Sequence, residues 1–265
     1  GAEGGDGGFV ETSGHRALDV AGARVDTRAP DGKTGDWLLD PTNIDIVSGP
    51  YGGILIGYGA PFDPLGNSTI TDGDINNTLG YSNLTIQTKA GTGGNGNITA
   101  TGVNINNFKN GATGNSLSML AYGDGPATGS ITITSSNFQL NTGGLTLVAG
   151  WDGNAGTNLA ASDGTNGSLT ITDSSLRAGA VDMKAVGNIS VIGLNIGSII
   201  ESSGAMNVQA SNIYLTGGNT FNNPANPNNG AFVYLKSGGA QTVAATGEIV
   251  LQAGSANNTL SGAPQ

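Results

Sequence analysis

The sequence predicts an all-β fold, a parallel β-helix (β-solenoid) with three strands per coil and loop insertions, and three observations indicate it. Glycine supplies 47 of the 265 residues, and charged residues make up only 11% of the chain, against about 25% in an average globular protein. Ile, Val, Leu and Thr alternate with polar residues in short stretches, which is the period of a strand with one buried face. Such stretches recur as an irregular repeat, and a repeat of this kind is typical of stacked coils.

The N-terminal segment consists of short strands between tight turns. A glycine-rich entry over residues 1–8 is followed by five β-prone pieces, each too short to form a hairpin with a core of its own. We therefore expect them to stack as the first coils, over residues 1–47. The five pieces are Phe9–Glu11, Leu18–Val20, Ala23–Asp26, Trp37–Leu39 and Ile44–Ile46.

Residues 48–80 break this pattern, because they carry three Pro together with many Gly and several aromatic residues. We expect an irregular insertion here, with one strand at Ile54–Ile56 and no more than one helical turn over Asp74–Leu79. Pro and Gly favour turns over regular strands, so the insertion is predicted to leave the solenoid and to cover one of its sides.

Residues 81–265 contain the β-helix repeats. Matching strands start at Leu84, Leu117, Leu145 and Val181, which lie 33, 28 and 36 residues apart, and further strands follow each of them. One coil cannot bury its inward face alone, so the next coil must stack on it at about 4.8 Å. With about 25 residues per coil, we expect about ten coils and a rod of about 50 Å. Inserts at 151–167 and 218–230 are expected to project from the corners of the rod.

The residues from Gly4 to Ile46 also resemble a known family. The run GGDGGFVETSG is followed by LDV, ARVDT, an Asp-Gly turn and WLLDP-x-x-I-x-I, and this order resembles the filamentous-haemagglutinin-like adhesins of two-partner secretion. The segment from Thr78 to Ile105, TLGYSNLTIQTKAGTGGNGNITATGVNI, is similar to the segment that follows in those exoproteins. The resemblance in motif covers residues 4 to about 108, and the rest of the chain is similar only in style.

The resemblance implies both an architecture and a function. It implies a right-handed β-helix that is exported through a dedicated outer-membrane transporter and folds outside a Gram-negative cell. The implied function is that of a secreted or cell-surface shaft that attaches to host-cell, glycan or matrix surfaces, or supports a biofilm matrix, without catalysis or a cofactor. A second hypothesis is an extracellular filament whose subunits join end to end, because a β-helix has open ends. A third and more remote hypothesis is a polysaccharide-degrading enzyme, an activity that other parallel β-helices carry.

The composition disfavours several partners. The formal net charge is −10 and only 9 residues are Lys or Arg, so neither nucleic acid nor an anionic membrane would attract the chain. No stretch reaches the roughly 18 apolar residues that a membrane span requires. Cysteine is absent, so no disulfide stabilises the fold. No signal peptide is visible at Gly1, from which we expect a processed or truncated chain.

Residues capable of catalysis are few. The only His, His15, has no nucleophile motif beside it, so we interpret it as a structural or surface residue. A sugar-cleaving β-helix requires carboxylates gathered on one face. The best candidate cluster is formed by Asp173, Arg177 and Asp182, which we interpret as a salt-linked corner.

Asp72, Asp74 and Asn76 have the alternate spacing of a calcium-binding loop. In such a loop the sixth position is Gly and the twelfth is Glu. Here these positions hold Asn77 and Asn83, and Asp and Asn are also common turn residues. The three residues are therefore only a weak calcium candidate.

Two further sets of residues carry hypotheses. The leading edge of the β-helix, at Phe9, Val10, Leu18 and Val20, is the expected contact for a neighbouring subunit in a filament. Seven sequons offer possible glycosylation sites, although most are expected from an Asn- and Thr-rich composition. They are Asn67, Asn76, Asn83, Asn97, Asn166, Asn188 and Asn257.

Overall fold

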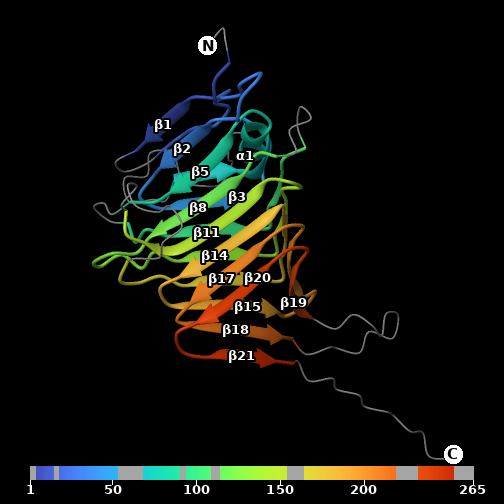
Figure 1. Cartoon of the computed structure of the whole chain (residues 1–265). Coiled ribbons are helices and arrows are strands. Elements are labelled where there is room, and N and C mark those ends of the chain that lie inside the picture. Colours follow the sequence, from blue (N-terminus) through green and yellow to red (C-terminus); the bar gives the residue numbers. More distant parts are fainter. Residues whose placement is uncertain are drawn as a thin grey trace, which may run out of the picture.

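A computed structural model of the chain confirms the parallel β-helix. The structure describes residues 4–14, 18–52, 68–89, 94–108, 114–153, 164–218 and 232–253. Strands of these residues form three long parallel sheets, which we call A, B and C, and the strands of each sheet follow sequence order except that β4 lies outside β3 (Figure 1). The strand predicted at 54–56 lies outside the described residues.

Sheet A and sheet B each contain eight strands, and sheet C contains five. Sheet A contains β1 (Phe9–Ser13), β2 (Asp36–Asp40), β5 (Asn83–Gln87), β8 (Leu117–Tyr122), β11 (Gly144–Trp151), β14 (Ala180–Ala185), β17 (Met206–Ala210) and β20 (Gln241–Ala245). Sheet B contains β4 (Ser68–Thr71), β3 (Ile44–Val47), β6 (Ile98–Thr101), β9 (Ile131–Thr134), β12 (Leu169–Thr172), β15 (Asn188–Gly193), β18 (Asn212–Gly217) and β21 (Ile249–Gln252). Sheet C contains β7 (Asn104–Asn106), β10 (Asn137–Gln139), β13 (Ser175–Ala178), β16 (Ser198–Ser202) and β19 (Val233–Ser237).

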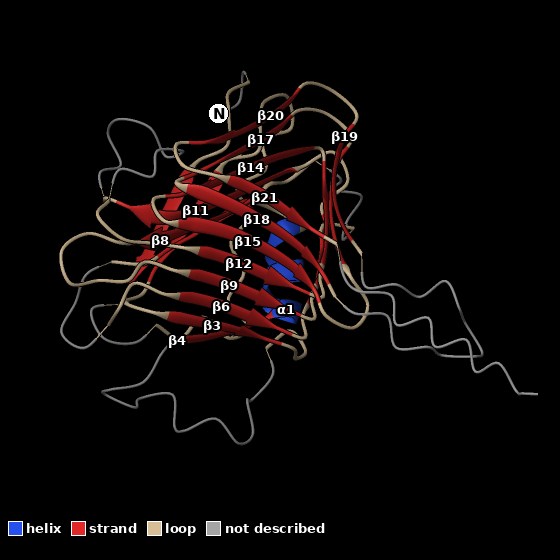
Figure 2. Ribbon diagram, turned by 90° about the horizontal axis from the view of Figure 1, so that it is seen from below, coloured by secondary structure: helices blue, strands red, loops and turns tan. Residues whose placement is uncertain are grey.

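From β5 onward, each coil passes through sheet A, then sheet B, then sheet C (Figure 2). Three strands per coil are therefore confirmed. The expected ten coils are too many, because sheet A has eight strands among the described residues. Seven intervals of about 4.8 Å give a column of about 34 Å. The expected number of coils was too high because the corner loops make each coil longer than the assumed length of about 25 residues.

Inward side chains form unbroken apolar columns along the axis. In sheet B, one column contains Ile44, Ile98, Ile131, Leu169, Ile189 and Ile213, all at most 2% exposed. In sheet C, Ile105, Phe138, Leu176 and Ile200 are stacked in the same way and are fully buried. The period-2 alternation in each strand, set in register with its neighbours, places like residues above one another.

Polar side chains make a second kind of column where the strands of sheet B begin. Asn43 Oδ1 accepts the Asn97 backbone N–H at 3.0 Å, and Asn97 Oδ1 accepts that of Ser130 at 2.9 Å. The pattern continues with Asn188 and Asn212, whose amides are joined at 2.9 Å, and ends where Asn212 Oδ1 accepts the Glu248 N–H at 3.0 Å. These bonds satisfy corner backbone groups that the sheets leave unpaired.

The described part of the predicted insertion is built into the column. Strand β4 pairs with β3 at the end of sheet B (Figure 2). Helix α1 (Asp72–Leu79) packs beside β7 at the end of sheet C. The helix has 8 residues, so the expectation of a single turn was wrong. The helix is longer than expected because Thr71 caps its N-terminus. The Thr71 hydroxyl accepts the Asp74 N–H at 3.0 Å.

Truncating the inward column should destabilise the whole chain. Phe138 is fully buried, so Phe138→Ala should lower the free energy of unfolding by about 3–5 kcal/mol. Phe108 is 53% exposed, and Phe108→Ala should change it by less than about 0.5 kcal/mol. Denaturant unfolding of both variants checks this, and equal losses would contradict the assignment of the core.

Candidate functional site

The carboxylates singled out in the sequence do not converge on one site. Arg177 pairs with Glu201, its Nε lying 3.1 Å from Oε2, whereas Asp182 pairs with Lys184 at 3.4 Å and accepts a hydrogen bond from the Asn207 amide. Asp173 accepts hydrogen bonds from the backbone N–H groups of Leu194 and Asn195. Among the described residues, no group of three His, Cys, Asp or Glu is placed to hold a metal ion. His15 lies outside them.

Asp173 forms the corner between sheets B and C. Its φ of 47° lies in the left-handed region, and Gly102 occupies the matching corner two coils earlier with φ of 64°. The Asp173 carboxylate accepts the backbone N–H groups of Leu194, Asn195 and Ile196 from the next coil, at 2.7–3.3 Å. Burial alone would raise the pKa of this carboxyl, but these bonds and one from the Asn195 side chain together lower it.

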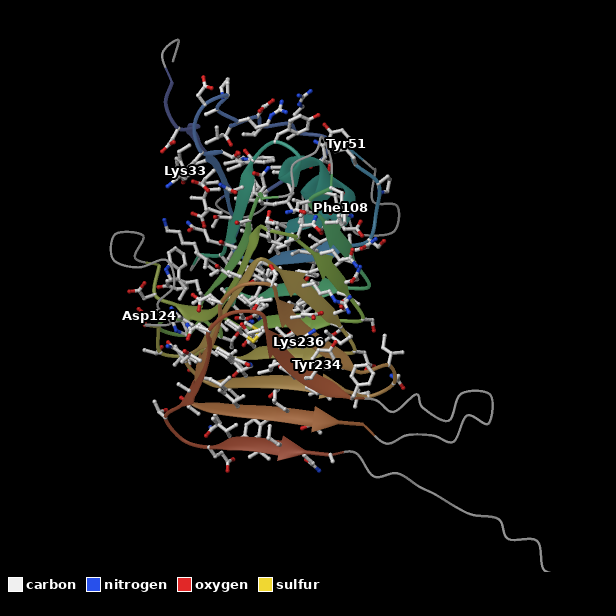
Figure 3. All side chains as sticks on the ribbon, turned by 45° about the vertical axis from the view of Figure 1, so that its right-hand side comes forward. Lys33, Tyr51, Phe108, Asp124, Tyr234 and Lys236 are labelled. Carbon is white, nitrogen blue, oxygen red and sulfur yellow. The ribbon has the colours of Figure 1, made fainter. Side chains whose placement is uncertain are left out.

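A column of alternating charge runs along the outer face of sheet C. Arg177, Glu201 and Lys236 occupy the same register position in β13, β16 and β19. Lys236 Nζ lies 2.7 Å from Glu201 Oε1, and hydrogen bonds from Lys236 and then Arg177 lower the pKa of the Glu201 carboxyl. Lys236, labelled in Figure 3, is the last member of the column among the described residues. Its side chain is 67% exposed.

The three residues of the calcium candidate lie in the N-terminal part of α1, where their side-chain oxygen atoms already accept hydrogen bonds. Asp72 accepts the N–H of Gly49 at 2.9 Å through one oxygen and that of Asn104 at 2.9 Å through the other. Asn76 accepts the N–H of Asn106 and donates to the carbonyl of Asn104, so it completes the free edge of β7. Asp74 accepts backbone N–H groups from Gly22 and Gly52, at 3.1 and 2.9 Å. N–H donors are the partners of an anion, and a calcium ion would have to displace them.

The sequons are mostly engaged in the fold. The amide nitrogen that a glycan would occupy donates to a backbone carbonyl in Asn76, Asn83 and Asn166. Asn97 and Asn188 accept hydrogen bonds through Oδ1 within the polar column of sheet B. Asn67 and Asn257 lie outside the described residues. Glycosylation therefore stays a prediction at all seven.

The predicted N-terminal contact edge separates into two parts. Strand β1 does form the edge of sheet A, and Phe9 and Val10 on it are 63% and 38% exposed. Leu18 and Val20 instead pack against the core of the first coils. Behind them the guanidinium groups of Arg24 and Arg28 lie over the ring of Tyr81, at 4.1 and 4.7 Å. The end of the column near β1 is thus partly closed by residues 18–28.

The opposite end of the described column is formed by β19, β20 and β21. Strands β19, β20 and β21 each end their sheet. Ile249 and Leu251 continue the two inward columns of sheet B, yet they are 48% and 73% exposed. Ile213, the register partner of Ile249, is fully buried, because strands of the described residues lie on both sides of β18 but on only one side of β21. In the sequence EIVLQAG, residues 248–254, Ile249 and Leu251 stand at alternate positions, and this spacing predicts that both side chains face inward.

A shallow depression of about 320 Å³ lies at the corner that joins sheet C to sheet A. Its rim includes Asp182 and Asn207, which are bonded to one another at 2.6 Å. Small residues of successive coils line its floor, namely Gly144, Ala180, Ala205 and Ala240. The depression follows from the repeated small corner residues, and no charged group without a partner faces it.

Comparisons with protein-family models, with curated proteins and with solved structures return no match. The resemblance to two-partner-secretion adhesins therefore rests on the sequence pattern alone. Among the helices of the described residues, none has the length and hydropathy needed to span a bilayer.

Removing the charge of Asp173 should destabilise the corner in a pH-dependent way. Asp173→Asn should lower the free energy of unfolding by about 1–3 kcal/mol at pH 7. Since the folded pKa is lowered, this contribution is present above the unfolded value of about 3.9 and is lost as the pH falls through the folded value. Chemical unfolding of the variant and of Asp31→Asn, at an exposed position, checks this. A difference from wild type that is the same at pH 3 as at pH 7 would contradict the assignment.

Calcium should leave the stability of the chain unchanged. Both oxygens of Asp72 and Oδ1 of Asp74 accept backbone N–H groups, and Oδ2 of Asp74 accepts the Thr71 hydroxyl. Calcium binding would cost the folded state these hydrogen bonds, so we expect no stabilisation by calcium. We expect the same melting temperature in excess calcium and in excess EDTA. A rise with calcium that disappears in Asp74→Asn would show instead that a site forms there.

Proposed function

We propose that the chain is a rigid shaft of a secreted or cell-surface adhesin of the filamentous-haemagglutinin-like, two-partner-secretion type. It attaches a Gram-negative cell to host-cell, glycan or matrix surfaces, or contributes to a biofilm matrix. Export through a dedicated outer-membrane transporter, with folding outside the cell, is part of the same proposal.

The observation that carries this proposal is the registration of successive coils along the column, which among the described strands shifts only at the bulge between Ala149 and Trp151. Apolar columns run through every coil from β3 to β18, and polar columns follow the corners. A column of coils stacked in this way has no hinge among its described strands. A force along its axis is therefore distributed over the hydrogen bonds between successive coils. A stiff element that carries load suits a molecule that holds a contact surface away from a cell.

The position of the sequence motif in the fold also supports the proposal. GGDGGFVETSG and WLLDP fall at β1 and β2, where the first coils meet. Gly35 in this region lies so close to the first coil that an added Cβ would be 2.0 Å from the Gly8 carbonyl oxygen. The motif therefore encodes close packing of coils, which is a structural role.

The filament and enzyme hypotheses have less support. A head-to-tail filament requires that both ends of the column accept a strand, whereas residues 18–28 partly close the end near β1. A sugar-cleaving enzyme requires gathered carboxylates, and Asp173 and Asp182 are each bound to separate partners.

An attachment assay tests the proposed function. Beads coated with the full chain should be retained under flow on epithelial monolayers or on matrix-coated glass more than beads coated with albumin. A control coat of heat-unfolded chain separates shaft-dependent attachment from general stickiness. Retention equal to albumin on both surfaces would refute an adhesive role.

A further inference from the structure

Asp40, the last residue of β2, is a carboxylate that the fold removes from water. Only 8% of the residue is exposed. Its Oδ1 atom is buried and has no hydrogen-bond partner among the described residues, and none of them forms an ion pair with it. A buried charge without a full set of partners costs free energy, so Asp40 opposes folding while it is ionised.

The neighbours of Asp40 come from the strands on either side of β2. Ser13 of β1 is its register partner, and Glu11, two residues earlier in β1, lies on the same outer face of sheet A. The Ser13 hydroxyl donates a hydrogen bond to Glu11 Oε1 at 2.6 Å. On the other side, the Gln87 side chain of β5 donates a hydrogen bond to the Asp40 carboxylate, and Lys89 follows β5 in the same segment.

These neighbours affect the protonation of Asp40 in opposite directions. Burial raises the pKa of the Asp40 carboxyl, Lys89 and the Gln87 hydrogen bond lower it, and the charge of Glu11 raises it. Burial is the largest of these effects, so the pKa in the folded state lies above the ordinary value. The charged groups that act on Asp40 are thus one anion from β1 and one cation from the segment after β5.

Uptake of a proton changes what Asp40 offers to β1. The ionised carboxylate only accepts hydrogen bonds and repels the charge of Glu11, whereas the protonated carboxyl has an O–H that donates. The acceptors on the facing strand are the Ser13 hydroxyl oxygen and the Glu11 carboxylate. Acidification therefore replaces a repulsion between the first two strands of sheet A with a donor that faces acceptors.

We propose that Asp40 is a pH switch between the first two coils, which strengthens the pairing of β1 with β2 when its carboxyl takes up a proton. Because the folded pKa is raised, the contact is strongest below the unfolded value of about 3.9 and weakens as the pH rises through the folded value. The sign is opposite to that expected for Asp173. The proposal goes beyond the adhesive function and does not depend on it, since it concerns the contact between β1 and β2 alone.

Hydrogen exchange of the β1 amides in the full chain tests the switch. In the wild type, the protection factors of these amides should rise about threefold or more when the pH is lowered from 7 to 5. Asp40→Asn has a permanent side-chain N–H donor and no charge, so it should show the higher protection at both pH values. Asp36→Asn, at the exposed start of the same strand, should keep the pH dependence of the wild type.

A titration of the Asp40 carboxyl by carbon-13 NMR needs no variant, and its midpoint in the wild type should lie above about 3.9. Glu11→Gln should lower that midpoint, because it removes the neighbouring anion. A wild-type midpoint at or below the ordinary value would overturn the proposal, as would β1 protection that does not change with pH. Lower protection in Asp40→Asn than in the wild type at pH 7 would also overturn it, by identifying Asp40 as an ion-pair partner of Lys89.

Discussion

Registered hydrogen bonding between successive coils is the interaction on which the rest of the structure depends. No single coil encloses a core, so each strand is stable only because the strands above and below complete its backbone bonds. The register also decides which side chains face inward. A shift of one residue would turn Ile131 and Ile133 to solvent and Thr132 to the core, so the apolar columns and the ladder stabilise one another.

This constraint explains where the polar residues lie in the fold. Asp and Asn are concentrated at corners, where the backbone leaves the sheets and its N–H groups need other acceptors. Asp173 performs this task for three consecutive N–H groups, and Asp72 with Asn76 performs it for the edge of β7. Residues that resemble a metal or catalytic site in the sequence are thus structural acceptors in the fold. The lowered pKa of Asp173 has the same origin.

Much of the fold was predictable from the sequence, because strand alternation and turn residues are local signals. Leu84, Leu117, Leu145 and Val181 were predicted as equivalent strand positions and do lie in one column of sheet A. The extent of α1 was not predictable in this way, since it depends on the Thr71 cap and on the unpaired edge of β7. The partners of Asp173 lie more than 20 residues away, where no local pattern identifies them.

Native-state hydrogen exchange tests the central claim most directly, because it reports the opening free energy of each coil separately. If coil-on-coil bonding holds the column together, amides of the inner strands β8, β11 and β14 should be the most protected. Protection should then decrease stepwise through β17 to β20, where a coil is paired on one side only. Equal protection of β20 and β11 would contradict the account.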